Sequence, residues 1–225
     1  MSVRRLRAIH RRLRKVQGDF TPKQQMPIID EVVMTVLSQH TSDINSTRAF
    51  RSLRERFSSW EEVLHAPTDQ VADSIRSGGI AQVKTTRIQQ ILREIERREN
   101  GLDLSRLARL PDEEVDEYLC SLPGVGPKTA ACVLLFSMNR PAFPVDTHVH
   151  RVAKRLGLIG EKTGADKAQR VLQPRIPPEL RYEMHMQLIR HGREICKPAM
   201  PRCTDCVLLD ICEAGPRFLA DGEAR

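Results

Sequence analysis

A proline- and glycine-rich turn between two helical patterns constrains the fold of this chain most strongly. Residues 112–139 read DEEVDEYLCSLPGVGPKTAACVLLFSMN, and apolar side chains recur at helical spacing on both sides of Pro123 to Gly126. Pro127 follows the turn and suits the first position of the second helix, because its missing N–H would be unpaired there anyway. The segment is therefore predicted to form two helices joined by a four-residue hairpin.

Apolar side chains follow helical rather than alternating spacing along most of the chain. Ile88, Ile91, Leu92 and Ile95 share one side of a predicted helix over about residues 83–100. No run alternates convincingly with period two, so a sheet is not expected. The sequence therefore predicts an all-α fold, with further helices over about residues 27–39 and 43–57, the second capped by Asp43.

The N-terminal stretch combines a helical apolar pattern with a strong positive charge. Leu6, Ile9, Leu13 and Val16 recur at helical spacing, while arginines and one lysine fill the other faces. The pattern fits a phosphate-facing arm, a transit peptide or the solvated basic face of an ordinary packed helix. A transit peptide is usually also rich in serine, and this stretch contains only one serine.

The composition is that of a globular protein with a polyanionic partner. Of the 225 residues, 40% are hydrophobic and 29% are charged, and the formal net charge is +7. Trp60 is the only tryptophan, so backbone capture of a duplex fits better than stacking of single-stranded bases. The longest apolar run, Ala130 to Phe136, is too short to cross a bilayer, and the N-terminus lacks the apolar segment of a secretory signal. We therefore expect a cytoplasmic protein that does not bind membranes.

The predicted hairpin has the properties of an anion-binding turn. Gly124 and Gly126 allow unusual backbone angles and close approach to a ligand. Backbone amides of the turn, including that of Val125, and of the following helix start would then point at an anion, for which a DNA phosphate is the natural candidate. The sequence Gly-Pro-Lys-Thr is not the end of a nucleotide-binding P-loop, because a proline separates the glycine from the lysine and no strand precedes it.

Lys128 is the candidate nucleophile. It falls in the first turn of the second helix, where the positive end of the helix dipole disfavours a cation and favours the neutral, nucleophilic amine. The alternative is a solvated lysine at a helix start. Beyond this helix, Asp146 precedes a new helical pattern, and it is expected to cap that helix and to supply a carboxylate to the site. His148 and His150 are two residues apart on this helix and face different ways, so they are interpreted as structural.

Four cysteines in the C-terminal region predict a metal site. They follow the spacing C-x6-C-x2-C-x5-C, and in an intracellular protein such a group is typical of metal binding rather than of disulfides. Zinc is the alternative for any four-cysteine site, but zinc sites commonly pair two short Cys-x2-Cys units and only one occurs here. The pattern favours an iron–sulfur cluster with four thiolate ligands, Cys196, Cys203, Cys206 and Cys212.

Taken together, these motifs resemble the endonuclease III family of helix-hairpin-helix DNA glycosylases. The resemblance rests on LPGVGPKTA at 122–130, VDTH at 145–148 and the cysteine spacing. VLSQHTSD at 36–43 looks like the strand-penetrating loop of that family, GGIAQVKTTRI at 78–88 like its second intercalating loop, and HGREIC at 191–196 like the approach to its cluster. The likeness extends over nearly the whole chain.

The resemblance implies two helical domains that flank an active-site cleft. A six-helix barrel containing the helix-hairpin-helix would span residues 25–140, and residues 1–24 and 141–225 would form a discontinuous domain that carries a [4Fe–4S] cluster. The loop around the cluster would hold Lys197 and Arg202 on the DNA phosphates.

The resemblance also assigns roles to individual residues. The catalytic lysine and aspartate of the family fall on Lys128 and Asp146. Ile80 matches the apolar wedge of the second loop, and Gln39 or His40 would fill the gap left by a flipped nucleotide. His40 stands where this family often has glutamine.

The implied activity is bifunctional. A monomer associated with the nucleoid would remove oxidised pyrimidines from damaged double-stranded DNA, form a Schiff base through Lys128 and cut the strand by β-elimination. The adenine-removing branch of the family is disfavoured, because it lacks a lysine at this position. Two alternatives stay open: a non-catalytic DNA-binding protein that uses the hairpin and cluster as phosphate clamps, and an enzyme that mainly cleaves abasic sites with weak glycosylase activity.

Overall fold

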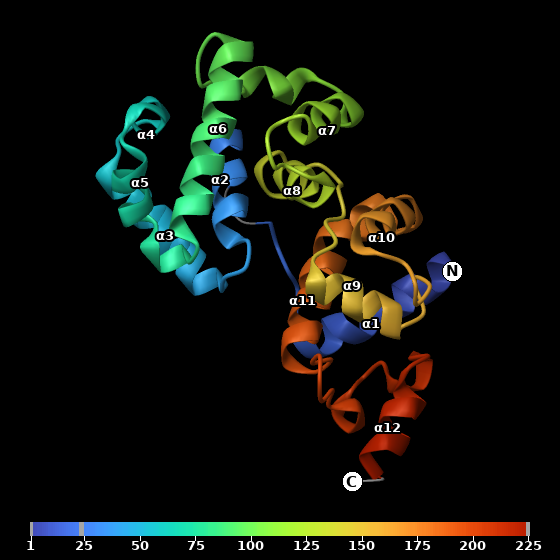
Figure 1. Ribbon diagram of the computed structural model, residues 1–225. Coiled ribbons are helices and arrows are strands. Elements are labelled where there is room, and N and C mark those ends of the chain that lie inside the picture. Colours follow the sequence, from blue (N-terminus) through green and yellow to red (C-terminus); the bar gives the residue numbers. More distant parts are fainter. Residues whose placement is uncertain (1, 23–24, 224–225) are drawn as a thin grey trace. The chain divides into compact units, whose positions relative to one another are not determined.

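The computed structural model describes residues 2–22 and 25–223, and this part of the chain contains helices and no strands (Figure 1). The prediction of an all-α fold is therefore confirmed. The chain divides into two compact units, one formed by residues 24–140 and the other by residues 1–23 and 141–225. Within the described residues, no helix combines the length and the apolar character needed to span a bilayer.

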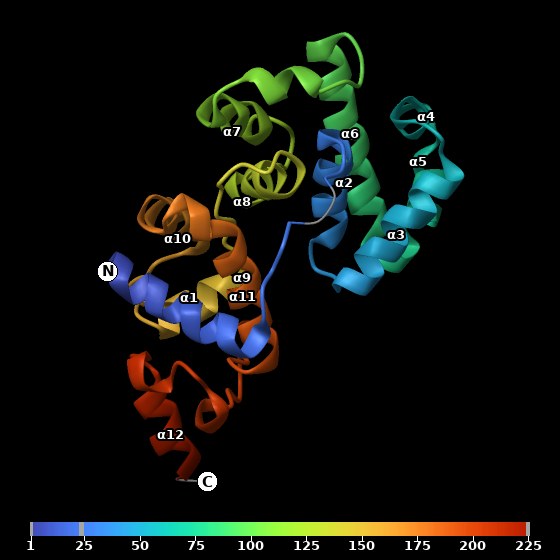
Figure 2. The ribbon, with the colours of Figure 1, turned by 180° about the vertical axis from the view of Figure 1, so that it is seen from behind.

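The unit of residues 24–140 is built around α2 (Ile28–Ser38), which packs against α3, α6 and α8. Figures 1 and 2 show α2 and α6 side by side from both directions. Seven of the eleven residues of α2 are buried, because its sequence is apolar on nearly all sides. The other helices of this unit are α3 (Asp43–Arg56), α4 (Trp60–His65), α5 (Thr68–Ser74), η1 (Arg76–Gly78), α6 (Ala81–Glu99), η2 (Ser105–Arg109), α7 (Asp112–Cys120), α8 (Pro127–Cys132) and the π-helical turn η3 (Val133–Ser137).

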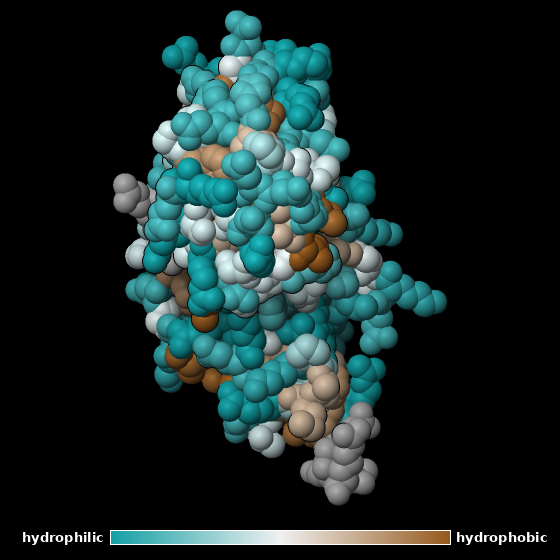
Figure 3. Space-filling view, turned by 60° about the vertical axis from the view of Figure 1, so that its left-hand side comes forward, coloured by the Kyte–Doolittle hydropathy of each residue, from teal (hydrophilic) through white to brown (hydrophobic). Residues whose placement is uncertain are grey.

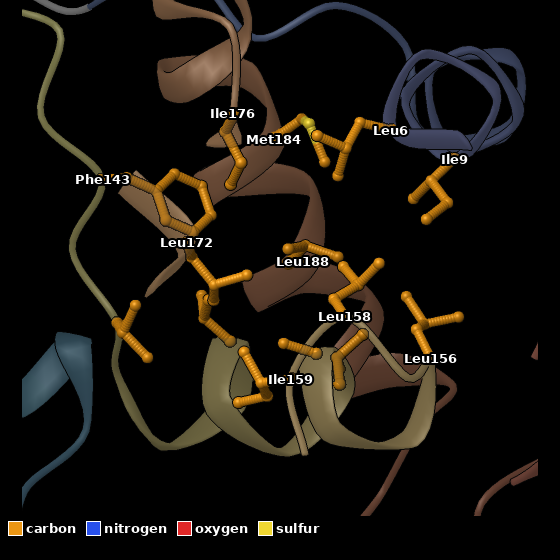
Figure 4. Close-up of a cluster of buried hydrophobic side chains, with 14 of the residues drawn as sticks. Leu6, Ile9, Phe143, Leu156, Leu158, Ile159, Leu172, Ile176, Met184 and Leu188 are labelled. Carbon is orange, nitrogen blue, oxygen red and sulfur yellow. The ribbon is translucent and has the colours of Figure 1, made fainter. Parts of the chain in front are cut away.

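The second unit joins the N-terminal helix α1 (Val3–Gln17) to the C-terminal third of the chain. In Figure 4, Leu6 and Ile9 extend from α1 into the same cluster of buried side chains as Met184 and Leu188. The remaining helices of this unit are α9 (Thr147–Arg155), α10 (Ala165–Leu172), η4 (Gln173–Arg175), η5 (Pro178–Leu180), α11 (Arg181–Glu194), η6 (Cys203–Asp205), η7 (Leu209–Ile211) and α12 (Gly215–Glu223).

The basic N-terminal segment is an ordinary packed helix in this unit. Leu6, Ile9 and Leu13 are fully buried, whereas Val16 is 56% exposed and does not belong to the packed face. Several arginines of α1 pair with acidic residues of the same unit or of the following turn, namely Arg5 with Glu213, Arg7 with Glu179, Arg12 with Asp210 and Arg14 with Asp19.

One predicted helix cap is wrong by a single residue. Asp43 was expected to cap α3, but it is the first helical residue, and the hydroxyl of Ser42 accepts the hydrogen bond from the Asn45 amide at 3.3 Å. Ser42 is extended (φ −78°, ψ 155°), as an N-cap residue must be. Asp43 still favours the helix start, because its carboxylate lies at the positive end of the dipole.

Candidate active site and cysteine pocket

The hairpin before α8 places Lys128. Gly126 is extended, Pro127 opens α8 and Lys128 follows as a half-buried side chain, so the predicted pair of helices joined by a hairpin is confirmed. Within the described part of the chain, the Lys128 amine has neither a hydrogen bond nor an ion pair. Gly124 has φ 69°, a conformation that glycine adopts without strain. The Val125 amide donates to the Leu122 carbonyl at 3.1 Å, which closes the turn of the hairpin.

Sequence reasoning missed a carboxyl group close to Lys128. Glu31 lies on the face of α2 that is buried, with 9% of its surface exposed, and its carboxylate accepts a hydrogen bond from the Thr35 hydroxyl at 3.3 Å. Burial raises the pKa of Glu31 to about 7, although the Thr35 hydrogen bond and the positive charge of Lys128 both act to lower it. The only signal in the sequence was a pair of acidic residues, Asp30 and Glu31, inside the otherwise largely apolar pattern IIDEVVMTVL.

The two loops that were expected to insert into DNA have unusual backbone conformations. His40 and Ile80 have φ angles of 54° and 40°, and both side chains are exposed, Ile80 by 56%. Gln39 is different, because it is half-buried and its Oε1 accepts a hydrogen bond from the guanidinium of Arg87 at 3.1 Å. The three predicted wedge residues therefore separate into two exposed side chains and one that is held by the protein.

Asp146 caps α9 as the sequence predicts. Its carboxylate accepts the Val149 amide at 2.7 Å, and its side chain is half-buried. Asp146 belongs to the unit of residues 1–23 and 141–225, whereas Lys128 belongs to the other unit. His148 and His150 both have partners in their own unit, the Arg151 guanidinium at 3.2 Å and the Thr163 carbonyl at 2.7 Å.

The four C-terminal cysteines line one pocket. Apolar side chains such as Leu156, Leu209 and Phe218 complete its wall. All four thiols are unoxidised and half-buried, and no group of three potential ligands among the described residues has the geometry of a closed metal site. Burial raises the pKa of Cys206 to about 11, with a further contribution from the nearby Cys212. The cysteines of the pocket are Cys196, Cys203, Cys206 and Cys212.

Two arginines of α9 hold the cysteine loop, and the sequence analysis did not single them out. Arg151 donates to the carbonyls of Cys196 (3.0 Å) and Gly192 (2.8 Å). Arg155 donates to the Cys196 sulfur at 3.3 Å and to the Lys197 and Pro198 carbonyls at 2.7 Å each. Arg151 and Arg155 are four residues apart on α9, so their side chains lie on the same face of the helix. This i, i+4 spacing was the signal in the sequence that could have identified them as a pair.

The two cations expected to contact phosphates differ in their surroundings. Lys197 is exposed, and its side chain has no hydrogen bond or ion pair within the described residues. Arg202 is also exposed, but its guanidinium donates to the Glu194 carbonyl at 2.9 Å and lies 4.0 Å from Asp205. Arg202 therefore supports the loop as well as carrying a charge.

A family model, sequence relatives and solved structures all match this chain to proteins of DNA repair. Residues 33–178 match the HhH-GPD superfamily of base excision DNA repair proteins. The chain is 36% identical over 182 residues to an endonuclease III of Thermotoga maritima, with 81% of each chain covered. It is 39% identical over 173 residues to a candidate DNA glycosylase of Arabidopsis thaliana, and the match covers 77% of this chain but only 59% of that longer protein. Among solved structures, a trapped covalent intermediate of endonuclease III with DNA superposes with a TM-score of 0.83 at 27% identity, covering 97% of this chain and 99% of the other.

Proposed function

The chain belongs to the HhH-GPD superfamily of base excision DNA repair proteins and, within it, to the endonuclease III family, and on this premise we propose that it excises oxidised pyrimidines from duplex DNA with Lys128 as its nucleophile. Family membership makes the chain a DNA-binding glycosylase that is also a lyase at apurinic or apyrimidinic (AP) sites. The observation that carries the proposal is the half-buried amine of Lys128 directly after the hairpin, which has no hydrogen bond or ion pair to any described residue.

The target nucleotide has to leave the duplex before the amine can reach it. Extrusion costs unstacking energy, and a damaged base costs less than an intact one, which contributes to selectivity. Side chains inserted in its place keep the duplex open. The exposed His40 and Ile80 suit this role, because each projects from a loop at a helix end, after α2 and before α6.

The chemistry then runs through one amine and one carboxylate. Nζ of Lys128 attacks C1′ of the deoxyribose, the glycosidic bond breaks, and the base leaves with the bonding electrons and gains a proton. The carboxylate of Asp146 stabilises the positive charge that develops on the sugar or assists the proton transfer. The attached nitrogen loses one proton, and the C1′–O4′ bond then breaks with proton transfer to O4′, which gives a protonated Schiff base between Nζ and C1′. Removal of a C2′ proton breaks the C3′–O bond and expels the 3′ phosphate by β-elimination.

The cysteine pocket fits a [4Fe–4S] cluster. Four thiols around one mostly apolar pocket match the ligand number of such a cluster, and the Arg155 guanidinium already donates to the sulfur of Cys196. When bound, the cluster would tie the loop together rather than take part in the excision. Arg151 and Arg155 hold the backbone of that loop, so that Lys197 and Arg202 are presented to phosphates.

Borohydride trapping tests the nucleophile. Wild-type protein should become covalently linked to DNA that contains an abasic site, because borohydride reduces the Schiff base to a stable amine. The Lys128→Ala variant should lose at least ~100-fold in trapping rate, the scale expected when a catalytic group is removed. Lys167→Ala is the matched control, since it removes an exposed lysine of α10. Undiminished trapping by Lys128→Ala would remove the assignment of the nucleophile.

Two further experiments test the role of Asp146 and the choice of substrate. Asn caps helices as well as Asp does, so Asp146→Asn should keep the stability of α9 while it loses most excision activity. Duplexes that contain an oxidised pyrimidine, 8-oxoguanine or no damage should be cut in that order. Trapping on abasic DNA without excision of oxidised pyrimidines would identify an AP lyase with weak glycosylase activity.

The protein is proposed to act as a monomer. Sedimentation of its complex with DNA would measure how many copies of the chain bind one duplex.

A further inference from the structure

The first turns of α6 contact all three loops that the proposed function assigns to DNA. Lys84 is 2% exposed, and its ammonium donates to the carbonyls of Leu37 and Gly78 at 2.7 Å each. Leu37 lies two residues before Gln39, and Gly78 lies two residues before Ile80. Lys84 therefore ties together the backbones that lead into the two inserting loops.

Arg87 lies one turn further along the same face and contacts the loop after α2 and the hairpin before α8. Its NH1 donates to Oε1 of Gln39 at 3.1 Å. Its side chain also runs against the hairpin, since a Cβ atom added to Gly124 would lie 2.6 Å from its Nε and 2.9 Å from its Cδ. A single guanidinium thus touches both the hairpin before Lys128 and the loop that contains His40.

The chemistry of this contact fixes the orientation of Gln39. A guanidinium has five N–H donors and no acceptor, so only the oxygen of the Gln39 amide can face Arg87. The Gln39 side chain is thereby occupied and half-buried, whereas His40 is exposed and no side-chain partner is found for it among the described residues. His40 also holds φ 54°, which persists only where the surroundings enforce it.

We propose that Arg87 is a positioning residue that acts through Gln39 to hold His40 in the conformation that enters the duplex, and so couples the hairpin to the wedge. This inference rests on the proposed function, because it explains how the protein holds the loop that contains His40, which that function assigns to DNA. It assigns the two adjacent polar residues different roles: Gln39 is the anchor and His40 is the side chain that inserts. The hairpin and the wedge then engage one duplex as a preorganised unit, which lowers the ordering cost of binding.

The test measures insertion without any chemistry. A duplex carries a stable tetrahydrofuran abasic analogue with 2-aminopurine opposite it, and fluorescence of the 2-aminopurine rises when a side chain disturbs its stacking. Saturation is checked by anisotropy for every variant. We expect Arg87→Ala, Gln39→Ala and His40→Ala each to reduce the fluorescence rise to less than about half of the wild-type value. Each variant removes one of the three side chains on which the insertion depends.

The fluorescence rise of a double variant distinguishes this coupling from a general structural defect. His40→Ala combined with Arg87→Ala should show the same rise as His40→Ala alone, because Arg87 acts only by placing His40. Arg87→Lys should recover part of the signal, since a lysine still donates one hydrogen bond to Gln39 but lacks the flat group that lies on Gly124. Arg93→Ala removes an exposed arginine of the same helix and should match wild type. The unfolding midpoint of Arg87→Ala should stay within about 2 °C of wild type.

The outcomes separate this inference from the proposed function. If the double variant loses signal beyond His40→Ala, or if Arg93→Ala loses as much as Arg87→Ala, the coupling is overturned even though Lys128 trapping succeeds. If Lys128 trapping fails while the fluorescence pattern holds, the nucleophile assignment falls and the coupling stands. A wild-type complex that is saturated but gives no rise would overturn the insertion of His40 itself.

Discussion

Two of the four non-glycine residues described with positive φ, His40 and Ile80, lie in the loops that we assign to DNA. Asparagine and histidine adopt this region more often than most residues, so Asn100, Asn139 and His40 are less unusual there than Ile80. For a β-branched residue such as isoleucine the conformation is a genuine outlier and costs on the order of 1–3 kcal/mol. The protein tolerates this cost where a side chain has to project from a tight turn.

The buried carboxyl group of Glu31 should make the stability of the protein depend on pH. In the unfolded chain its carboxyl titrates near the ordinary value of 4.5, but in the folded protein burial raises the pKa to about 7. Between these values the folded state keeps a proton that the unfolded state has lost, so the free energy of unfolding falls as pH rises through this window. Glu31→Gln should remove this fall. The variant should therefore match wild type near pH 4 and exceed it at pH 8 by on the order of 2–3 kcal/mol.

The measurement is chemical denaturation of both proteins across that pH range. Glu61→Gln is the matched control, because it makes the same substitution at an exposed glutamate, in the first turn of α4, where the burial that acts on Glu31 is absent. A constant difference between Glu31→Gln and wild type from pH 4 to pH 8 would mean that Glu31 binds its proton equally in the folded and unfolded states, and it would contradict the raised pKa.

Residues with a local role could be predicted from the sequence, and residues with a distant partner could not. Asp146 was predicted as an N-cap because its partner, the Val149 amide, lies three residues away. Arg87 and Gln39 are 48 positions apart, and Arg155 reaches a cysteine 41 positions away. The helical pattern around an arginine does not indicate which distant residue it will contact, because only the folded chain brings the two together.

At the scale of elements, turn chemistry was the most informative signal. The hairpin between α7 and α8 and the proline at the start of α8 follow from glycine and proline requirements that few other structures share. The π-helical turn η3 directly after α8 was not predicted, because Val133 to Ser137 reads as a continuous helical pattern. Such turns add one residue to a helix without changing its apolar periodicity enough to be recognised.

The four cysteines of the C-terminal loop lead to a prediction about the bound metal. If it holds a [4Fe–4S] cluster, purified protein should be yellow-brown and contain about four irons per chain with matching sulfide. Cys206→Ser should lose most of the iron and the visible absorbance, because it removes one of four thiolates from the pocket. Cys120→Ser, in α7 and outside that pocket, should keep both. Stoichiometric zinc without visible absorbance would contradict the cluster.

At the scale of the whole molecule, the fold class was predicted correctly because every long segment has one clear periodicity. The assignment of α1 to the same unit as the C-terminal third rests on contacts such as Arg5 with the carbonyls of Leu156 and Ile211. In the sequence these residues are more than 150 positions apart, and nothing local in α1 distinguishes a helix that packs there from a solvated arm. The resemblance to a known family implied the pairing, and the physical pattern alone did not.

The net charge of +7 leads to a prediction about DNA affinity that depends on where the charge lies. Phosphate contacts release counterions, so the logarithm of the binding constant should fall linearly with the logarithm of salt concentration, by about 0.9 per phosphate contacted. Lys197 has no acidic partner among the described residues, and Lys197→Ala should reduce that slope by about one contact. Arg7 is already paired with Glu179 at 3.2 Å in a packed helix, so Arg7→Ala should leave the slope unchanged. Fluorescence anisotropy from 50 to about 200 mM salt measures both slopes, and an equal loss from the two variants would assign α1 to the DNA contact as well.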